Sequence, residues 1–109
     1  MNPTRHRHPP AAAVATALLF TAFSAYGQSA QALQTRALAA TCANCHGTDG
    51  NAVQGQAMPR LAGLQKTYIV EQMQAFRDGK RPATVMHQLA KGYSNEQIDA
   101  LAGFFAAQK

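Results

Sequence analysis

The feature that most constrains this chain is the stretch CANCH at residues 42–46, which holds its only two cysteines. Cys42 and Cys45 are separated by two residues, and His46 follows the second cysteine directly. Small domains bury a modest fraction of their surface and usually need a disulfide, a metal or a cofactor to support the core. We therefore expect that support to involve these three side chains.

The beginning of the chain has the order of a secretory signal peptide. Two arginines lie in a basic lead, an apolar stretch covers residues 11–23, and small residues at 25 and 27 match a cleavage site. The apolar stretch is shorter than the roughly 20 residues that span a bilayer. We expect residues 1–27 to be a signal peptide and residues 28–109 to form one domain, exported to the periplasm without stable membrane insertion.

The charge of the remaining chain excludes one class of function. Residues 28–109 hold eight basic and five acidic side chains. The basic residues form no run and do not alternate with aromatic residues, as they would in a nucleic-acid-binding surface. We expect no nucleic-acid partner.

Helical spacing predicts the first part of the fold. Apolar residues from Leu33 to Thr41 recur with helical spacing and predict a helix that leads into CANCH. Glycines and polar residues make regular structure unlikely over residues 47–60, where we expect a loop. A second helix is predicted over residues 65–78, with Gly79 as its stop signal.

The rest of the chain also reads as helical. A short helix is expected from Met86 to Lys91, ending at Gly92. Ser94 and Gln97 have the spacing of a capping box and open a last helix. No alternating strand pattern of useful length occurs, so the sequence predicts an all-α fold. Four aromatic residues are expected in the core, namely Tyr68, Phe76, Phe104 and Phe105.

Three kinds of chemistry use two cysteines at this spacing. A redox-active C-x-x-C normally lies between a strand and a helix, and no strand is predicted here. A closed structural zinc site needs four ligands, whereas Cys42, Cys45 and His46 supply three, and His87 is the only other histidine after residue 27. The third kind is the attachment of c-type haem, for which C-x-x-C-H is the signature. This interpretation uses every residue of the motif, with two thioether bonds to the haem and His46 beneath the iron.

Beyond this motif, the sequence resembles that of a known family, the class I c-type cytochromes. The resemblance covers about residues 34–109 and is carried by the stretches ALAATCANCHGTDGNA, MPRLAGLQKTYIVEQMQAFRDGKRP and TVMHQLAKGYSNEQIDALAGFFAAQK. Within the class, these stretches are similar to the two-haem periplasmic cytochromes and to the cytochrome subunit of flavocytochrome c sulfide dehydrogenase. VMHQLAKGYS resembles the sulfide dehydrogenase subunit in particular. The resemblance implies helices wrapped around one covalently attached haem c.

The resemblance also implies roles for single residues. Cys42 and Cys45 would form the thioether bonds, and His46 and Met86 would be the axial ligands of the iron. Pro59 would accept a hydrogen bond from the His46 ring through its carbonyl oxygen, which fixes the orientation of a ligating histidine. One departure is Phe104, which stands where relatives commonly have tyrosine.

Position along the chain favours Met86 over the other candidates for the sixth ligand. Met73 falls on the apolar face of the predicted helix over residues 65–78, where methionine ordinarily packs. Met58 precedes Pro59, which is needed on the side of His46. Met58 and an open coordination position remain alternatives, and His87 is expected to face the solvent.

Two arginines are candidates for contacts with the haem propionates. Arg60 and Arg81 flank the expected haem-binding loops, and a guanidinium group forms charge-assisted hydrogen bonds with carboxylates. A solvated surface position is the alternative for each.

The function implied is the transfer of single electrons by a protein that has no substrate chemistry of its own. One version of this role is the haem subunit of a flavoprotein dehydrogenase, in particular one that oxidises sulfide. The alternative is a free periplasmic shuttle between redox proteins. A thiol–disulfide oxidoreductase is the remote alternative from another class.

Overall fold

A computed structural model describes residues 29–55 and 57–109. The predicted signal peptide over residues 1–27 lies outside the described residues. Residues Leu33–Lys109 form one compact unit, which contains the CANCH stretch. Among the described residues, no helix is both long and apolar enough to cross a bilayer.

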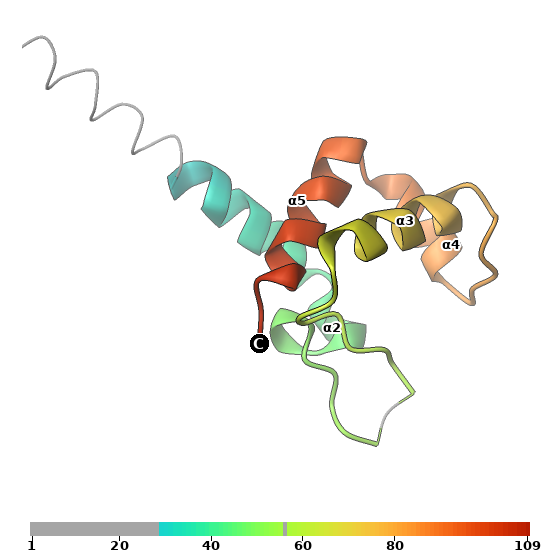
Figure 1. The fold of residues 1–109 in the computed structure, drawn as a ribbon, viewed down its shortest axis with the longest axis horizontal. Helices are drawn as coiled ribbons and strands as arrows, with labels where there is room; N and C mark the ends of the chain where they lie inside the picture. The colour runs from blue at the N-terminus through green and yellow to red at the C-terminus, as the bar shows by residue number, and fades with distance from the viewer. Residues whose placement is uncertain (1–28, 56) are drawn as a thin grey trace, which may run out of the picture. The chain divides into compact units, whose positions relative to one another are not determined.

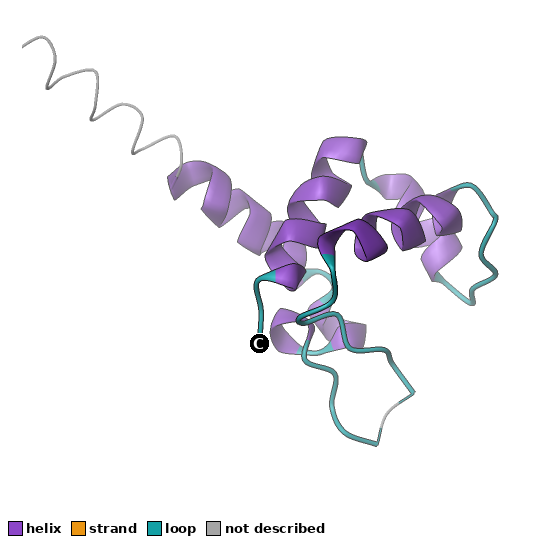
Figure 2. Cartoon of the chain, in the orientation of Figure 1, coloured by secondary structure: helices purple, strands orange, loops and turns teal. Residues whose placement is uncertain are grey.

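The described residues form helices and loops without a strand (Figure 2). A helix over residues 29–40 leads through a turn to the short helix α2 (Ala43–His46). The elements that follow are the 3₁₀ turn η1 (Thr48–Gly50), α3 (Lys66–Arg77), α4 (Met86–Leu89), η2 (Ala90–Gly92) and α5 (Asn95–Ala106). Figure 1 labels the α-helices α2 to α5. The all-α prediction is confirmed.

The core lies between α3, α5 and the end of the first helix. Its buried members are small or apolar, and α3 and α5 pack against each other. They are Ala39, Ile69, Leu101, Ala102 and Phe105. Tyr68 was expected in the core but is 45% exposed. The buried residue of α3 is its neighbour Ile69, and adjacent residues of a helix lie on different faces. The ammonium of Lys66 also pairs with Asp99 on α5, with a distance of 2.7 Å between Nζ and Oδ1.

The ends of the two long helices match the signals in the sequence. Gln65 is the N-cap of α3 and Asp78 is its C-cap, so Gly79 follows the helix in a left-handed conformation with φ of +72°. At α5, the Ser94 side chain accepts a hydrogen bond from the Gln97 backbone N–H, and the Gln97 side chain accepts one from the Ser94 N–H. The predicted capping box is therefore present.

Two predicted segments differ in detail from the structure. The stretch over residues 47–60 was expected to be a loop, but it contains the 3₁₀ turn η1 near its start. Asp49, within η1, has a positive φ of +53°. The segment expected as one helix from Met86 to Lys91 is divided into α4 and η2, and η2 includes Gly92. Short 3₁₀ turns leave weak sequence signals because they need only one or two hydrogen bonds.

Gly50 closes the loop that follows the CANCH stretch. Its carbonyl oxygen accepts hydrogen bonds from the backbone N–H groups of Leu61, at 2.9 Å, and Ala62, at 3.1 Å. The next residue, Gly63, donates its N–H to the carbonyl oxygen of Phe105 on α5 at 3.0 Å. The loop over residues 51–60 therefore begins and ends at one place, which brings its last residues back to α2.

Candidate functional site

Helix α2 arranges the CANCH stretch as a single helical turn. The carbonyl oxygen of Cys42 accepts hydrogen bonds from the N–H groups of Cys45, at 3.3 Å, and His46, at 2.9 Å. Residues three and four apart lie on the same side of a helix. The turn thus places the two thiols and the imidazole of His46 on neighbouring parts of one helical surface.

Gly47 ends this turn directly after His46. Its φ is +79°, and a Cβ atom at this position would lie 2.0 Å from the carbonyl oxygen of Asn51. No side chain larger than a hydrogen atom fits such a close approach of two backbones. The glycine therefore lets the chain leave α2 toward η1 without displacing His46.

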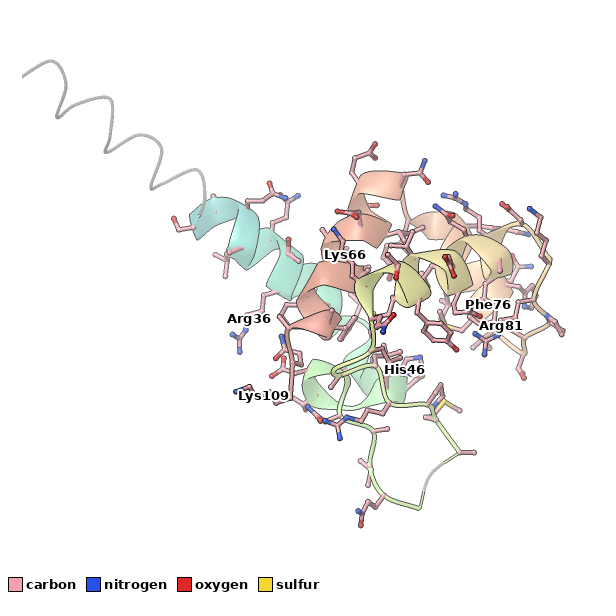
Figure 3. All side chains as sticks on the ribbon, in the orientation of Figure 1. Arg36, His46, Lys66, Phe76, Arg81 and Lys109 are labelled. Atoms are coloured by element: carbon pink, nitrogen blue, oxygen red, sulfur yellow. The ribbon has the colours of Figure 1, made fainter. Side chains whose placement is uncertain are left out.

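His46 is held in one tautomer by Pro59. The ring is buried, with 8% of the residue exposed, and Nδ1 lies 2.8 Å from the Pro59 carbonyl oxygen. A carbonyl oxygen only accepts hydrogen bonds, so Nδ1 carries the proton and donates it. In the neutral ring, Nε2 then keeps a free electron pair, which is the form that binds a metal ion. The contact implied by the family resemblance is thus present, and Figure 3 shows His46 on α2.

The Cys42 thiol differs from the attacking thiol of a redox-active C-x-x-C. Cys42 and Cys45 are both free, Cys42 being half-buried and Cys45 exposed. Burial raises the pKa of the Cys42 thiol, against a smaller lowering by the hydrogen bond of Thr41. Thiol–disulfide enzymes instead lower the pKa of the attacking cysteine.

The structure also gives no support to a zinc site. In the ranges 29–55 and 57–109, no group of three or more His, Cys, Asp or Glu side chains is arranged to hold a metal ion. Cys42, Cys45 and His46 project from one short turn, and a tetrahedral site needs ligands that converge from several directions.

Met86 is the first residue of α4 and is partly buried. The other described methionines have different surroundings. Met73 packs against the core cluster from α3, as expected, and Met58 is 44% exposed in the loop before Pro59. Met86 also follows an irregular segment, residues 78–85, and its helix packs against α3. Its position suits a ligand from a second part of the chain.

The prediction that His87 faces the solvent is wrong for part of the ring. The residue is partly buried, and its Nδ1 atom is buried without a hydrogen-bond partner among the described residues. Helix α4, which carries His87, packs against α3. The residues around His87 gave no signal of this burial in the sequence.

Arg81 and Arg60 lie in different surroundings. The Arg81 guanidinium donates a hydrogen bond to the Gln72 side chain, and its Cζ atom lies 4.6 Å from the centre of the Phe76 ring. Arg81 is therefore held against α3, as Figure 3 shows beside Phe76. Arg60 is exposed directly after Pro59. Both arginines remain candidates for propionate contacts.

One contact near the site was not predicted from the sequence. The hydroxyl oxygens of Thr41 and Tyr93 lie 3.1 Å apart, although the residues are 52 positions apart in the chain. Local periodicity carries no information on such a pair. The KGYS stretch, which contains Tyr93, indicates a family resemblance and does not predict this contact.

The donor set fits a covalently attached haem. Two free thiols and an imidazole with a free Nε2 electron pair lie on one turn, and Met86 offers a thioether from another segment. Exposed apolar side chains in the segments that contain the donors suit contact with a porphyrin. They are Val85 and Leu89, which lie before and after Met86.

An α-helical domain with this turn and this donor set defines a class, the small haem proteins that transfer electrons. Comparison with known sequences gives the family: the cytochrome c profile matches residues 32–108, and the chain belongs to the cytochrome c family. The matched domain accordingly carries covalently attached haem c, the electron-carrying group of this family.

Individual relatives agree with this assignment. The cytochrome subunit of sulfide dehydrogenase from Chlorobaculum tepidum is 41% identical over 68 residues, which are 62% of this chain and 60% of that protein. Cytochrome c-554(548) from Halomonas halodenitrificans is 40% identical over 74 residues, 63% of this chain and 86% of that protein.

A solved structure supports the fold. The chain matches a cytochrome c4 of Acidithiobacillus ferrooxidans with a TM-score of 0.64 and 31% identity, over 72% of this chain and 50% of that one. The expected class I cytochrome fold is confirmed. The chain spans less than two thirds of the length of several relatives, including the sulfide dehydrogenase subunit.

Proposed function

We propose that Cys42 and Cys45 attach the haem and that His46 and Met86 are the axial ligands of its iron. The proposal rests on the hydrogen bond of 2.8 Å between His46 Nδ1 and the Pro59 carbonyl oxygen, which leaves Nε2 free to bind a metal. Bound haem supplies an iron atom that exchanges one electron with a partner. The chain holds the imidazole in one tautomer and one orientation while that exchange occurs.

Ligation by His46 and Met86 would make the protein a carrier without substrate chemistry. Two protein ligands leave no coordination position at which a substrate could bind. A neutral thioether sulfur favours ferrous over ferric iron, so the reduction potential would lie above that of a site with two histidines. The Cys42 and Cys45 thioether bonds would keep the cofactor attached during repeated oxidation and reduction.

A substitution tests the role of Met86. In Met86→Ala the visible spectrum of the ferric protein should change and the iron should bind added imidazole far more tightly. Met73→Leu is the matched control, because Met73 packs against the core cluster and should leave the spectrum unchanged. A Met86→Ala spectrum equal to that of the wild type would refute the assignment.

The proposed physiological role is that of the haem subunit of a flavoprotein dehydrogenase that oxidises sulfide. The observation that carries this role is the 41% identity to the cytochrome subunit of a sulfide dehydrogenase, together with the KGYS resemblance. Electrons would pass from a flavin on the partner to the haem of this chain. The chain itself would then be the non-catalytic part of the enzyme.

A free electron shuttle is the second candidate. It is favoured by the similarity to cytochrome c-554(548), of which the matched region covers 86%. Such a carrier would meet its redox partners through a small and short-lived interface.

Export to the periplasm is part of both proposals. The basic lead, the apolar stretch and the small residues at 25 and 27 support a signal peptide over residues 1–27. Haem would be attached to the domain over residues 28–109 after export. N-terminal sequencing of the protein from its native source tests the cleavage position, and an intact N-terminus would contradict this part of the proposal.

One purification separates the two roles. The protein is isolated gently from its native source at low salt, and its absorption spectrum is recorded in the oxidised and reduced forms. Flavin absorbance that accompanies the haem bands through purification, with reduction of the haem by sulfide, supports the dehydrogenase subunit. Haem bands without flavin, from a protein of single-chain mass, support the shuttle.

A further inference from the structure

The hydrogen bond between Tyr93 and Thr41 has a defined direction. The Thr41 hydroxyl donates to the carbonyl oxygen of Leu38 at 2.7 Å. A hydroxyl group has one hydrogen to donate, so at 3.1 Å the Tyr93 hydroxyl is the donor and Thr41 Oγ1 the acceptor. Thr41 therefore relays a contact from Tyr93 to the end of the first helix.

Thr41 belongs to the turn from which the haem attachment stretch begins. Its backbone N–H donates to Leu38 at 3.2 Å, and the N–H of Cys42 donates to Ala39 at 3.1 Å. Its Oγ1 atom lies 3.9 Å from the Cys42 sulfur. A displacement of Thr41 would therefore move Cys42, the first residue of the attachment stretch.

Tyr93 belongs to the segment that contains Met86. Its N–H lies 3.4 Å from the carbonyl oxygen of Ala90, the first residue of η2, and η2 follows α4 directly. Its ring is partly buried and packs against the core cluster. Because the ring packs there, the position of the Tyr93 hydroxyl beside Thr41 is fixed by the core.

We infer that Tyr93 is a positioning residue, whose hydroxyl ties the segment carrying Met86 to the turn carrying Cys42 and so keeps Met86 on the iron. The inference rests on the proposed ligand role of Met86. A sixth ligand from α4 stays bound only while α4 and α2 keep their separation. The Tyr93–Thr41 hydrogen bond is a direct side-chain link between the segments adjoining those two helices.

Competition with imidazole measures this effect in the haem-containing protein. Added imidazole binds the ferric iron only in molecules whose sixth ligand has left, so its apparent affinity is proportional to the fraction in that state. Tyr93→Phe keeps the ring and removes the hydroxyl. Because Thr41 is exposed and water competes for the bond, we expect imidazole affinity to rise roughly two- to fivefold.

Four further variants control the experiment. Tyr68→Phe removes a hydroxyl that makes no hydrogen bond in the described part of the chain, and it should leave imidazole affinity unchanged. Thr41→Val should raise the affinity at least as much as Tyr93→Phe, because it also removes the hydrogen bond to Leu38. Adding Tyr93→Phe to Thr41→Val should raise the affinity little further, because both changes remove the Tyr93–Thr41 bond. Thr41→Ser keeps the hydroxyl and should restore the wild-type affinity.

A purely structural role is distinguished by denaturation. If Tyr93→Phe lowers global stability but leaves imidazole affinity at the wild-type value, the inference is overturned. Met86→Ala, measured alongside, separates this failure from that of the proposed function. If Met86→Ala also fails to change imidazole affinity, then Met86 is not the ligand and both proposals are wrong.

Discussion

Replacement of Gly50 by alanine should destabilise the protein strongly. Gly50 has a φ of +79°, and an added Cβ atom would lie 2.8 Å from Phe105 Cδ1, 2.9 Å from Leu61 Cβ and 3.0 Å from the Ala62 nitrogen. The left-handed conformation costs a non-glycine residue about 1–2 kcal/mol. Overpacking against a buried side chain costs about 1–3 kcal/mol more. The sum predicts a loss of about 2–5 kcal/mol in the free energy of unfolding.

Gly79→Ala is the matched control for the steric part of this loss. Gly79 has a similar φ of +72°, but no atom lies within 4 Å of its added Cβ. Only the conformational cost of about 1–2 kcal/mol should appear there. Guanidinium denaturation of the haem-containing proteins, followed by circular dichroism, gives both values from the midpoint and slope. If Gly50→Ala loses no more stability than Gly79→Ala, the close approach to Phe105 and Leu61 is not a constraint.

Three smaller effects concern the helix ends and the surface. Ser94→Ala removes the capping box of α5 and should cost about 1 kcal/mol in denaturation, whereas an unchanged midpoint would contradict its role. Asp99→Asn breaks the exposed pair with Lys66 and should cost at most about 1 kcal/mol, less at high salt; a larger, salt-independent loss would contradict this account. The pKa of Glu96 is lowered by a hydrogen bond to its own backbone and then by one with Ser94. The lowered pKa means that Glu96 stabilises the fold above its unfolded pKa and loses this effect as pH falls through the folded value. Glu96→Gln should therefore be less stable than the wild type at neutral pH but not in acid, and a difference that persists in acid would exclude this cause.

Local signals were sufficient to predict the two long helices α3 and α5 and their ends. Gly79 after α3 and the Ser94–Gln97 capping box act through hydrogen bonds within a few residues, so the sequence contains all the partners. Spacing within CANCH likewise determined which side chains share a turn. The contact between His46 and Pro59 was implied by family resemblance, because 13 positions separate its partners and no periodicity connects them.

Contacts between distant segments were not predictable from the pattern of residues. The exposure of Tyr68 depends on which face of α3 meets α5, and the burial of His87 Nδ1 depends on contacts of α4 with other segments. Arg81 turns toward Gln72 and Phe76 on α3, which flanking position alone did not indicate. Tyr93 and Thr41 meet only because the chain closes on itself.

The reduction potential of Met86→His, compared with that of the wild type, tests the central claim most directly. If His46 and Met86 hold the iron, replacing the thioether by imidazole removes the preference for ferrous iron. Electrochemistry of the two haem-containing proteins should show a clear fall in potential in the variant, with both proteins six-coordinate. An unchanged potential would mean that Met86 does not bind the iron, and it would contradict the account of this protein as a His46–Met86 electron carrier.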